Sequence, residues 1–246
     1  MHRLYLSLAT SVLACCLLLT SRPTHTAETW PARSEADLAR DIASQPQAVL
    51  DFFGVAAGMT VVDMFAGNGY YSELAAHRVT ERGKIYLHNN QAFMQYSPEL
   101  ATRVADNRLP NVEVYVRELQ DINLASNSVD VVLLVLTYHD AYFVSNGWDV
   151  TSEPLLATIL RILKPGGTLG VIDHKALPGS GAAAAQRLHR IDPEFARAQI
   201  TRQGFHFAGS TDLLHNPQDS LADSVFEPAI RGQTSRFVYK FTKPLE

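Results

Sequence analysis

Apolar residues between positions 58 and 175 gather into short runs, and segments with helical spacing separate these runs. Alternation of apolar and polar residues is typical of half-buried strands. A run that is almost all valine and leucine is typical of a parallel strand buried on both faces. The predicted strands are 61–64, 84–88, 112–116, 129–136 and 168–173, and the predicted helices between them are 70–79, 97–107 and 153–163.

Helices are also predicted before the first strand. Ser34 stands three residues before Asp37, which is a capping-box pattern, and apolar positions with helical spacing follow. Pro46 interrupts this run and Gly54 ends it, as expected at helix boundaries. The chain therefore places at least two helices ahead of the sheet.

The pattern changes after the fifth strand. An Asp-Pro pair begins a helix over 194–203, and 205–214 and 236–242 are predicted as two strands with no comparable helix between them. We expect these strands to pair antiparallel at one edge of the sheet. Their connection, 215–235, is long for a compact domain, and such loops are often functional or mobile.

This order of elements predicts an α/β fold. The expected architecture is a doubly wound, mostly parallel seven-stranded sheet with an antiparallel hairpin at its C-terminal edge. We expect a single domain over 28–246. Its N-terminal helices occupy 28–57, its central sheet and helices 58–175, and its last helix and antiparallel strands 176–246.

Residues 1–27 have the layout of a secretory signal peptide, with a basic start, an apolar run and a polar end. The apolar run is short for a membrane span, so stable membrane insertion after cleavage is not expected. We predict export to the periplasm, and lipid attachment at Cys15 is the alternative. Both cysteines, Cys15 and Cys16, lie in this leader, so the mature chain would contain no thiol.

Charge changes the picture of possible partners. The leader holds two of the 21 basic residues and none of the 25 acidic ones, so the mature part carries a net charge of −6. Nucleic-acid-binding proteins normally have the opposite balance and a clustered basic patch. The sequence therefore predicts no nucleic-acid partner, and it gives no indication of the oligomeric state.

The segment VVDMFAGNGYYS, residues 61–72, joins the first strand to its helix. In a doubly wound sheet, ligands bind beyond the carboxyl ends of the strands, beside such a connection. Gly67 and Gly69 let the main chain approach a ligand, while the Asp63 carboxylate suits a cation or hydroxyl better than a phosphate. The G-x-G-x-x-G of dinucleotide-binding loops is absent, which argues against a nicotinamide oxidoreductase. Taken alone, the glycine pair is also compatible with a simple tight turn.

Two further segments, NSVDVV at 127–132 and LRILKPGGTL at 160–169, follow this loop in a characteristic order. Together with the loop, they resemble class I S-adenosylmethionine-dependent methyltransferases from about residue 50 to the C-terminus. The leader and the RIDP segment at 190–193 resemble a bacterial group of predicted exported methyltransferases. The resemblance implies a Rossmann-like methyltransferase fold, S-adenosylmethionine as cofactor and methyl transfer to a small molecule that the sequence does not identify.

The resemblance also implies which residues bind the cofactor. The Asp63 carboxylate and the glycine-loop backbone would hold the methionine moiety, and an acid after the third strand would hold the adenine amino group, with Asp121 as the other choice. The second strand normally ends in an acid for the ribose hydroxyls, but asparagines stand there, and they bind a diol without charge assistance. The implied cofactor contacts are Asp63, Phe65, Ala66, Gly67, Asn68, Gly69, Asn89, Asn90, Glu118 and Leu119.

Candidate catalytic residues follow the fourth strand: Tyr138, His139 and Asp140. Methyl transfer is an in-line displacement that depends largely on alignment, so few catalytic groups are obligatory. His139 is the best-placed general base near neutral pH, and a capping or solvent-facing histidine is the alternative. Asp173 and His174 follow the adjacent strand, so two Asp-His pairs could bind a divalent metal. Because polar residues at strand ends usually just meet water, no metal site is predicted.

These observations favour an exported methyltransferase of a small molecule. The alternative is a non-catalytic protein that keeps the fold but binds another nucleoside or metabolite. Three features favour that alternative: the missing ribose acid, Phe65 where a glycine is expected, and export away from the cytoplasm, where the methyl donor is made.

Overall fold

The computed structural model describes residues 33–145 and 147–246. The predicted leader over residues 1–27, including Cys15 and Cys16, lies outside the described residues. Within the described part of the chain, no helix is long and apolar enough to cross a lipid bilayer.

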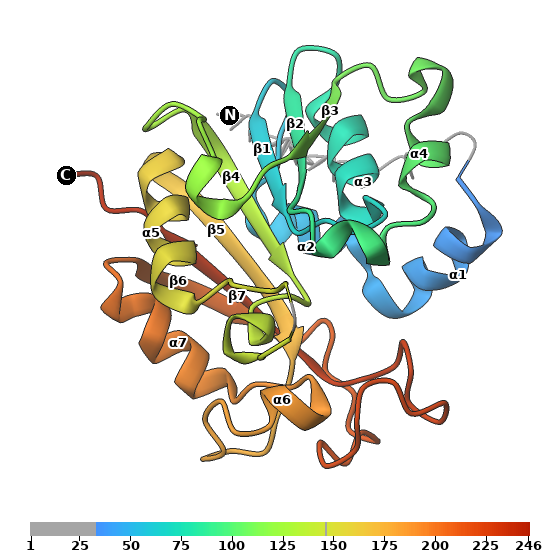
Figure 1. Ribbon diagram of the computed structural model, residues 1–246, viewed down its shortest axis with the longest axis vertical. Coiled ribbons are helices and arrows are strands. Elements are labelled where there is room, and N and C mark those ends of the chain that lie inside the picture. The colour runs from blue at the N-terminus through green and yellow to red at the C-terminus, as the bar shows by residue number, and fades with distance from the viewer. Residues whose placement is uncertain (1–32, 146) are drawn as a thin grey trace, which may run out of the picture. The chain divides into compact units, whose positions relative to one another are not determined.

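Seven strands of the described chain form one sheet in the order β3-β2-β1-β4-β5-β7-β6 (Figure 1). The strands β1 to β5 are parallel to one another, and β7 runs antiparallel to both β5 and β6. This confirms the predicted α/β sheet with antiparallel C-terminal strands. The strands are β1 (Thr60–Met64), β2 (Lys84–Asn89), β3 (Val112–Val116), β4 (Val129–Val135), β5 (Leu163–His174), β6 (His206–Thr211) and β7 (Arg236–Thr242).

The first two helices begin and end where the sequence predicts. Ser34 caps the first helix, because its Oγ accepts a hydrogen bond from the Asp37 N–H at 3.1 Å. Pro46 begins the second helix, and Gly54 ends it with a φ of 77°. The α-helices are α1 (Glu35–Ser44), α2 (Pro46–Phe53), α3 (Tyr70–Val79), α4 (Leu100–Arg103), α5 (Ser152–Ile162), α6 (Ala185–Leu188) and α7 (Pro193–Arg202).

The helix predicted over 97–107 is shorter in the structure. It consists of α4 followed by the 3₁₀ turn η2 (Ala105–Asn107). Asp106 and Asn107 have left-handed φ angles of 53° and 55°, which end the helix. Aspartate and asparagine tolerate this conformation better than most residues, so the helical pattern gave no warning of the break.

β5 begins five residues before the predicted strand 168–173. Leu163 already pairs with Val129 of β4, and regular pairing resumes with Thr168 opposite Val131. The four residues between these pairs form a bulge, and β5 therefore starts earlier than the apolar pattern indicates.

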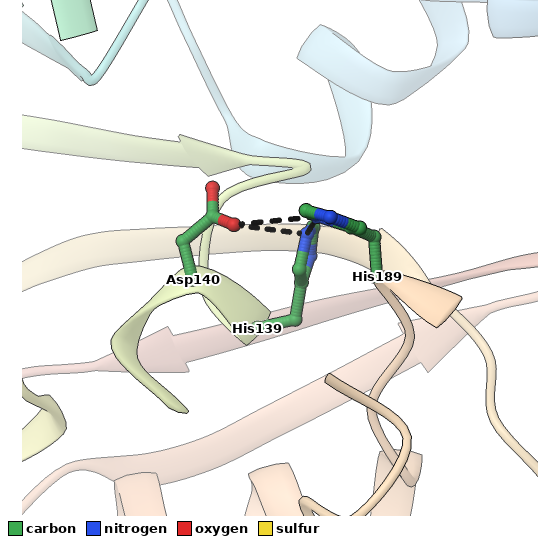
Figure 2. A group of neighbouring side chains, drawn as sticks. All are labelled: His139, Asp140 and His189. Carbon is green, nitrogen blue, oxygen red and sulfur yellow. Dashed lines mark hydrogen bonds and ion pairs between the residues drawn. The ribbon is translucent and has the colours of Figure 1, made fainter. Parts of the chain in front are cut away.

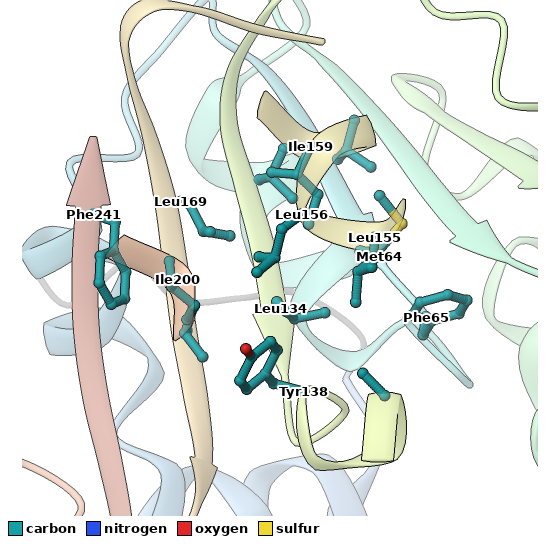
Figure 3. Packing of buried hydrophobic residues seen from close by; sticks show 14 of the residues in the cluster. Met64, Phe65, Leu134, Tyr138, Leu155, Leu156, Ile159, Leu169, Ile200 and Phe241 are labelled. Atoms are coloured by element: carbon teal, nitrogen blue, oxygen red, sulfur yellow. The ribbon is translucent and has the colours of Figure 1, made fainter. Parts of the chain in front are cut away.

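Helices cover both faces of the sheet. On one face, α5 and α7 contribute Leu155, Ile159 and Ile200, which pack against Met64 and Leu169 of the strands (Figure 3). On the other face, α2 packs against β5, β7 and α3. Burial on both faces explains why the central strands are nearly continuous apolar runs.

The long connection predicted at 215–235 is anchored by a buried ion pair. The guanidinium of Arg190 donates two hydrogen bonds of 2.9 Å to the Asp219 carboxylate, and both side chains are fully buried. The same carboxylate accepts the N–H of Leu221 at 3.0 Å and the N–H of Ser235 at 2.6 Å. The connection is therefore tied to the domain near its start and at its end.

Candidate functional site

The loop between β1 and α3 turns sharply beyond the carboxyl end of β1. Phe65, Gly67 and Gly69 all have left-handed φ angles, of 54°, 58° and 78°. A Cβ on Gly69 would lie 2.5 Å from a methyl carbon of Leu87, so glycine is required where α3 begins. Phe65 adopts the same region without being glycine, which costs about 1–3 kcal/mol and needs compensating contacts.

Neighbouring side chains hold this loop from two sides. Asn89, at the end of β2, accepts the Gly67 N–H at 2.9 Å and donates to the Gly67 carbonyl at 3.0 Å. From α4, the Arg103 side chain donates to the Asn68 carbonyl at 2.5 Å. The Asn68 side chain in turn accepts the Glu99 N–H at 2.9 Å. The glycine loop is thus fixed by hydrogen bonds that are independent of any ligand.

Asp63 is the buried carboxylate of the loop. It borders a cavity of about 400 Å³, the Asp63 cavity, which Phe65, Ala66, Gly67 and Asn68 also line. Burial raises the pKa of Asp63 to about 6, although a 2.6 Å hydrogen bond from the Ser72 hydroxyl lowers it. Its ionised form therefore gains from any cation that enters this cavity.

Two hydroxyl groups in the Asp63 cavity lack partners. Tyr71 Oη and Thr137 Oγ1 are buried, and neither forms a hydrogen bond within the described part of the chain. Buried polar groups are normally hydrogen-bonded, so these two are available to a polar ligand or to water. Arg40 of α1 lines the same cavity and supplies a positive charge. A carboxylate, a guanidinium and two free hydroxyls fit the amino-acid end of S-adenosylmethionine.

The residues predicted to bind the adenosine end lie elsewhere. Asn89 is used by the glycine loop, and Asn90 accepts the Phe93 N–H at 2.8 Å. Glu118 accepts the Gln91 N–H at 3.1 Å, and Leu119 packs in the apolar core. None of the four lines the Asp63 cavity. The side chains of Asn89, Asn90 and Glu118 each already bond to a backbone group, and their assignment to the ribose and adenine stays a prediction.

Aromatic rings stand beside the loop instead. The Phe65 ring lies 5.0 Å from Trp148 and 5.8 Å from Phe93, measured between ring centroids, and Phe93 lies 5.8 Å from Trp148. The ring of His88 also contacts Phe65 at 5.0 Å. These contacts compensate for the left-handed backbone of Phe65.

A second cavity of about 510 Å³, the His139 cavity, adjoins the first. Phe93, Tyr96 and Leu136 line both cavities, so the two meet at these residues. His139 and Asp140, at the start of the 3₁₀ turn η4 (His139–Tyr142), line the second cavity, as the sequence predicts for the end of β4. Its walls also include His174, His189, Trp148, Val225 and Phe226.

His139 is held by Asp173 from β5. The Asp173 carboxylate accepts the His139 backbone N–H at 2.7 Å and lies 2.7 Å from the ring Nδ1. Burial lowers the pKa of His139, but the negative charges of Asp173 and Asp140 outweigh this effect and raise it to about 10. A ring with a raised pKa must lose a proton before it can act as a general base, and that role of His139 stays a prediction.

Tyr138 lies in the apolar core rather than at a cavity wall (Figure 3). Its hydroxyl is 3.1 Å from Ser152 Oγ and 3.3 Å from the Tyr142 hydroxyl. This placement removes Tyr138 from the residues that can reach a ligand in either cavity. Successive residues after β4 thus point in different directions, which the sequence alone does not reveal.

His189 completes a group that sequence reasoning missed. It follows α6, and its Nδ1 lies 3.3 Å from Nε2 of His139 and 3.7 Å from Oδ1 of Asp140 (Figure 2). No local spacing signals this approach, because 50 residues separate the two histidines. Asp173 stands behind His139, and His174 bonds to Thr234 at 2.7 Å, so the Asp-His pair of β5 does not join this group.

Comparison with known proteins agrees with the fold. A family model described as a methyltransferase domain matches residues 56–214. The ubiquinone/menaquinone biosynthesis C-methyltransferase UbiE of Salmonella enteritidis is 23% identical over 176 residues, which cover 70% of this chain and 66% of that protein's length.

Two solved structures share the architecture. A SAM-dependent methyltransferase from Aquifex aeolicus is 24% identical with a TM-score of 0.58, and the match covers 80% of this chain and 88% of the Aquifex chain. The [4+2]-cyclase SpnF is 17% identical with a TM-score of 0.60, and the match covers 88% of this chain and 87% of SpnF. At these identities the likeness shows the fold alone. Because the family model covers more than half of the sequence, the chain belongs to the methyltransferase domain family.

Proposed function

We propose that the protein is an S-adenosylmethionine-dependent methyltransferase that acts on a small molecule. The observation that carries the proposal is the Asp63 cavity, where a buried carboxylate and two unpartnered hydroxyls border the glycine loop. In this assignment Asp63 binds the ammonium group of the cofactor, and Tyr71, Thr137 and Arg40 bind its carboxylate.

The adenosine end would be held differently from the pattern that the resemblance implied. Asn89 and Asn90 stand where an acid for the ribose hydroxyls is expected, and each already bonds to a backbone group. Phe93 and Trp148 offer flat apolar faces instead, and purines stack well on such rings. We therefore assign adenosine recognition mainly to stacking, with Phe93 adjusting its position.

The acceptor would occupy the His139 cavity. S-adenosylmethionine supplies a methyl group on a positively charged sulfur, and in-line transfer requires donor and acceptor to be held on opposite sides of that methyl. The two cavities meet at Phe93, Tyr96 and Leu136, which allows this arrangement. The walls formed by Trp148 and Phe226 favour an acceptor with an apolar or aromatic body. The proposal includes export through residues 1–27, which cell fractionation of the full chain would test.

A non-catalytic binding protein is the second candidate. The observation that favours it is that Asn89, Asn90 and Glu118, which were expected at the ribose and adenine, each already bond to a backbone group. A protein of this kind would bind a small zwitterion in the Asp63 cavity without the nucleoside. The fold itself does not decide, because SpnF is a cyclase on a similar architecture.

Calorimetric titration separates these functions. S-adenosylmethionine and S-adenosylhomocysteine are expected to bind, and Asp63→Ala is expected to weaken both affinities by about 10- to 100-fold, the loss of one charged hydrogen bond. Asp212→Ala, which removes an exposed carboxylate outside both cavities, is the matched control and should bind like the wild type. Binding of methionine but not of either nucleoside would favour the second candidate, and no binding of any of the three would remove the first.

A further inference from the structure

Three side chains of metal-binding type converge at the wall of the His139 cavity. Nε2 of His139 lies 3.2 Å from Oδ1 of Asp140 and 3.3 Å from Nδ1 of His189, and the last two atoms are 3.7 Å apart. In Figure 2 all three side chains point toward a common centre. One ligand atom from each residue falls within a sphere small enough for a single ion.

The separations match the coordination geometry of zinc. Two ligand atoms about 2.0–2.1 Å from one tetrahedral Zn²⁺ lie about 3.3–3.4 Å apart. Two sides of the observed triangle are within about 0.2 Å of this value, and the third exceeds it by a distance that a rotation of the half-buried His189 ring would remove. Two imidazole nitrogens and one carboxylate oxygen suit zinc or a related transition metal better than magnesium or calcium.

A second shell already orients the first of these ligands. Asp173 bonds to Nδ1 of His139, which directs Nε2 at Asp140 and His189, and an ion bound there would displace the proton from Nε2. Carboxylates that bind the far nitrogen of a histidine in this way are usual behind metal-ligating histidines. Asp173 is fully buried and also accepts the His139 N–H, so its position does not depend on an ion.

The other histidine is also held in place. The His189 ring lies 4.7 Å from the ring of Phe143 and 4.8 Å from that of Phe226, measured between centroids. His189 itself ends α6 in a left-handed conformation, with a φ of 54°. The approach of this ring to His139 is therefore determined by the fold rather than by a flexible surface side chain.

We propose that His139, Asp140 and His189 bind a divalent transition-metal ion, zinc first among them, with a fourth coordination position open to the His139 cavity. Three protein ligands and an open position are the arrangement of catalytic rather than structural zinc sites. An ion here would bind and activate a thiol, hydroxyl or water that enters the cavity. This site does not depend on methyl transfer, and metal binding can be measured without any activity.

The test is a titration of the chelator-stripped protein with ZnCl₂ in competition with a chromophoric chelator. One equivalent of zinc is expected to bind, and Co²⁺ should give the visible absorption of a four-coordinate site. Asp173→Asn is expected to lower the zinc affinity by about 10- to 100-fold. His189→Ala removes a ligand and is expected to lower the zinc affinity by about 100-fold or more. Thermal unfolding adds a second readout, because zinc should stabilise the wild type but not His189→Ala.

Two comparisons keep the result unambiguous. His206→Ala removes an exposed histidine outside the cluster and should leave zinc binding unchanged. His189→Ala should unfold at nearly the wild-type temperature in the absence of metal, which shows that the variant is folded. If the wild type binds no zinc, or if His189→Ala binds it equally well, the three side chains form a hydrogen-bonded cluster only and the metal site is wrong.

Discussion

Asp63 lies near the end of β1 and Asn89 ends the neighbouring strand β2, and the sequence assigns both to one ligand. In the structure their roles differ. The Asn89 side chain forms hydrogen bonds with the N–H and the carbonyl of Gly67. Asp63 has a hydrogen bond from one neutral side chain, Ser72, and it also borders a cavity. A buried carboxylate with so little compensation costs stability when it ionises. This cost to the fold is what the proposed binding role of Asp63 leads us to expect.

The pKa of Asp63 predicts how this cost depends on pH. Since burial raises the pKa from 3.8 to about 6, the folded state binds more protons than the unfolded state between these values, and stability falls as the pH rises through this range. Asp63→Asn removes the charge. The variant should match the wild type near pH 4 and exceed it by about 3 kcal/mol above pH 7. Urea unfolding at several pH values measures this, and an equal difference at all of them would contradict it.

At the scale of elements, α2 packs closely on the sheet, next to the helix that lines the Asp63 cavity. The Phe53 ring at the end of α2 packs on Gly170 of β5, where an added Cβ would lie 2.7 Å from ring carbons. The preceding helix α1 contributes Arg40 and Asp37 to the cavity wall. Because α1 and α2 meet at Gln45, the packing of α2 on β5 limits where α1 and its Arg40 can lie.

Gly170→Ala should force the Phe53 ring away from the sheet. Overpacking of this kind costs about 1–3 kcal/mol in the free energy of unfolding. Phe53→Leu makes room for the new methyl group, so the double variant should be more stable than the sum of the two single changes by about 1 kcal/mol. Chemical denaturation of all four proteins measures this coupling. Strict additivity would mean that α2 moves freely over β5.

At the scale of the molecule, Arg190 connects three distant parts of the chain. Besides Asp219, it donates to the Lys175 carbonyl at 2.9 Å and to the Asp223 carbonyl at 2.8 Å. Val225 and Phe226, which follow directly, line the His139 cavity. Burial raises the pKa of Asp219, but the hydrogen bonds from Arg190 outweigh this effect and hold it below its usual value. The buried pair therefore positions one wall of the cavity.

Arg190→Met should destabilise the protein by about 3–5 kcal/mol, because it leaves the Asp219 charge buried and unpaired. Adding Asp219→Asn removes that charge while keeping an acceptor for the backbone, so the double variant should recover part of the loss. Glu113→Gln, which breaks an exposed pair with Lys84, is the control and should change stability by less than about 1 kcal/mol. Thermal and urea unfolding measure all three, and equal effects of Arg190→Met and Glu113→Gln would refute a structural role for the buried pair.

Much of the fold could be predicted from the sequence. Hydrophobic period and helix-boundary residues such as Ser34, Pro46 and Gly54 gave the helices and strands in the right order, because these signals are local. The expected helix over 97–107 failed where Asp106 and Asn107 turn left-handed, a conformation that residue type permits but does not require. The glycine loop and its Asp63 were recognisable for the same local reason, since a sharp turn after a buried strand needs residues of these kinds.

The sequence by itself determined the class of fold, the family and the loop that faces a ligand. Other contacts were decided only by the tertiary structure. Asn89 bonds to Gly67, Asp173 and His189 both contact His139, and Arg190 pairs with Asp219. Each of these contacts joins residues 22 to 50 positions apart. Local propensity determines whether a segment forms a helix, a strand or a turn. Which side chains meet depends on how these elements pack against one another, and the order of residues along the chain does not show that packing directly.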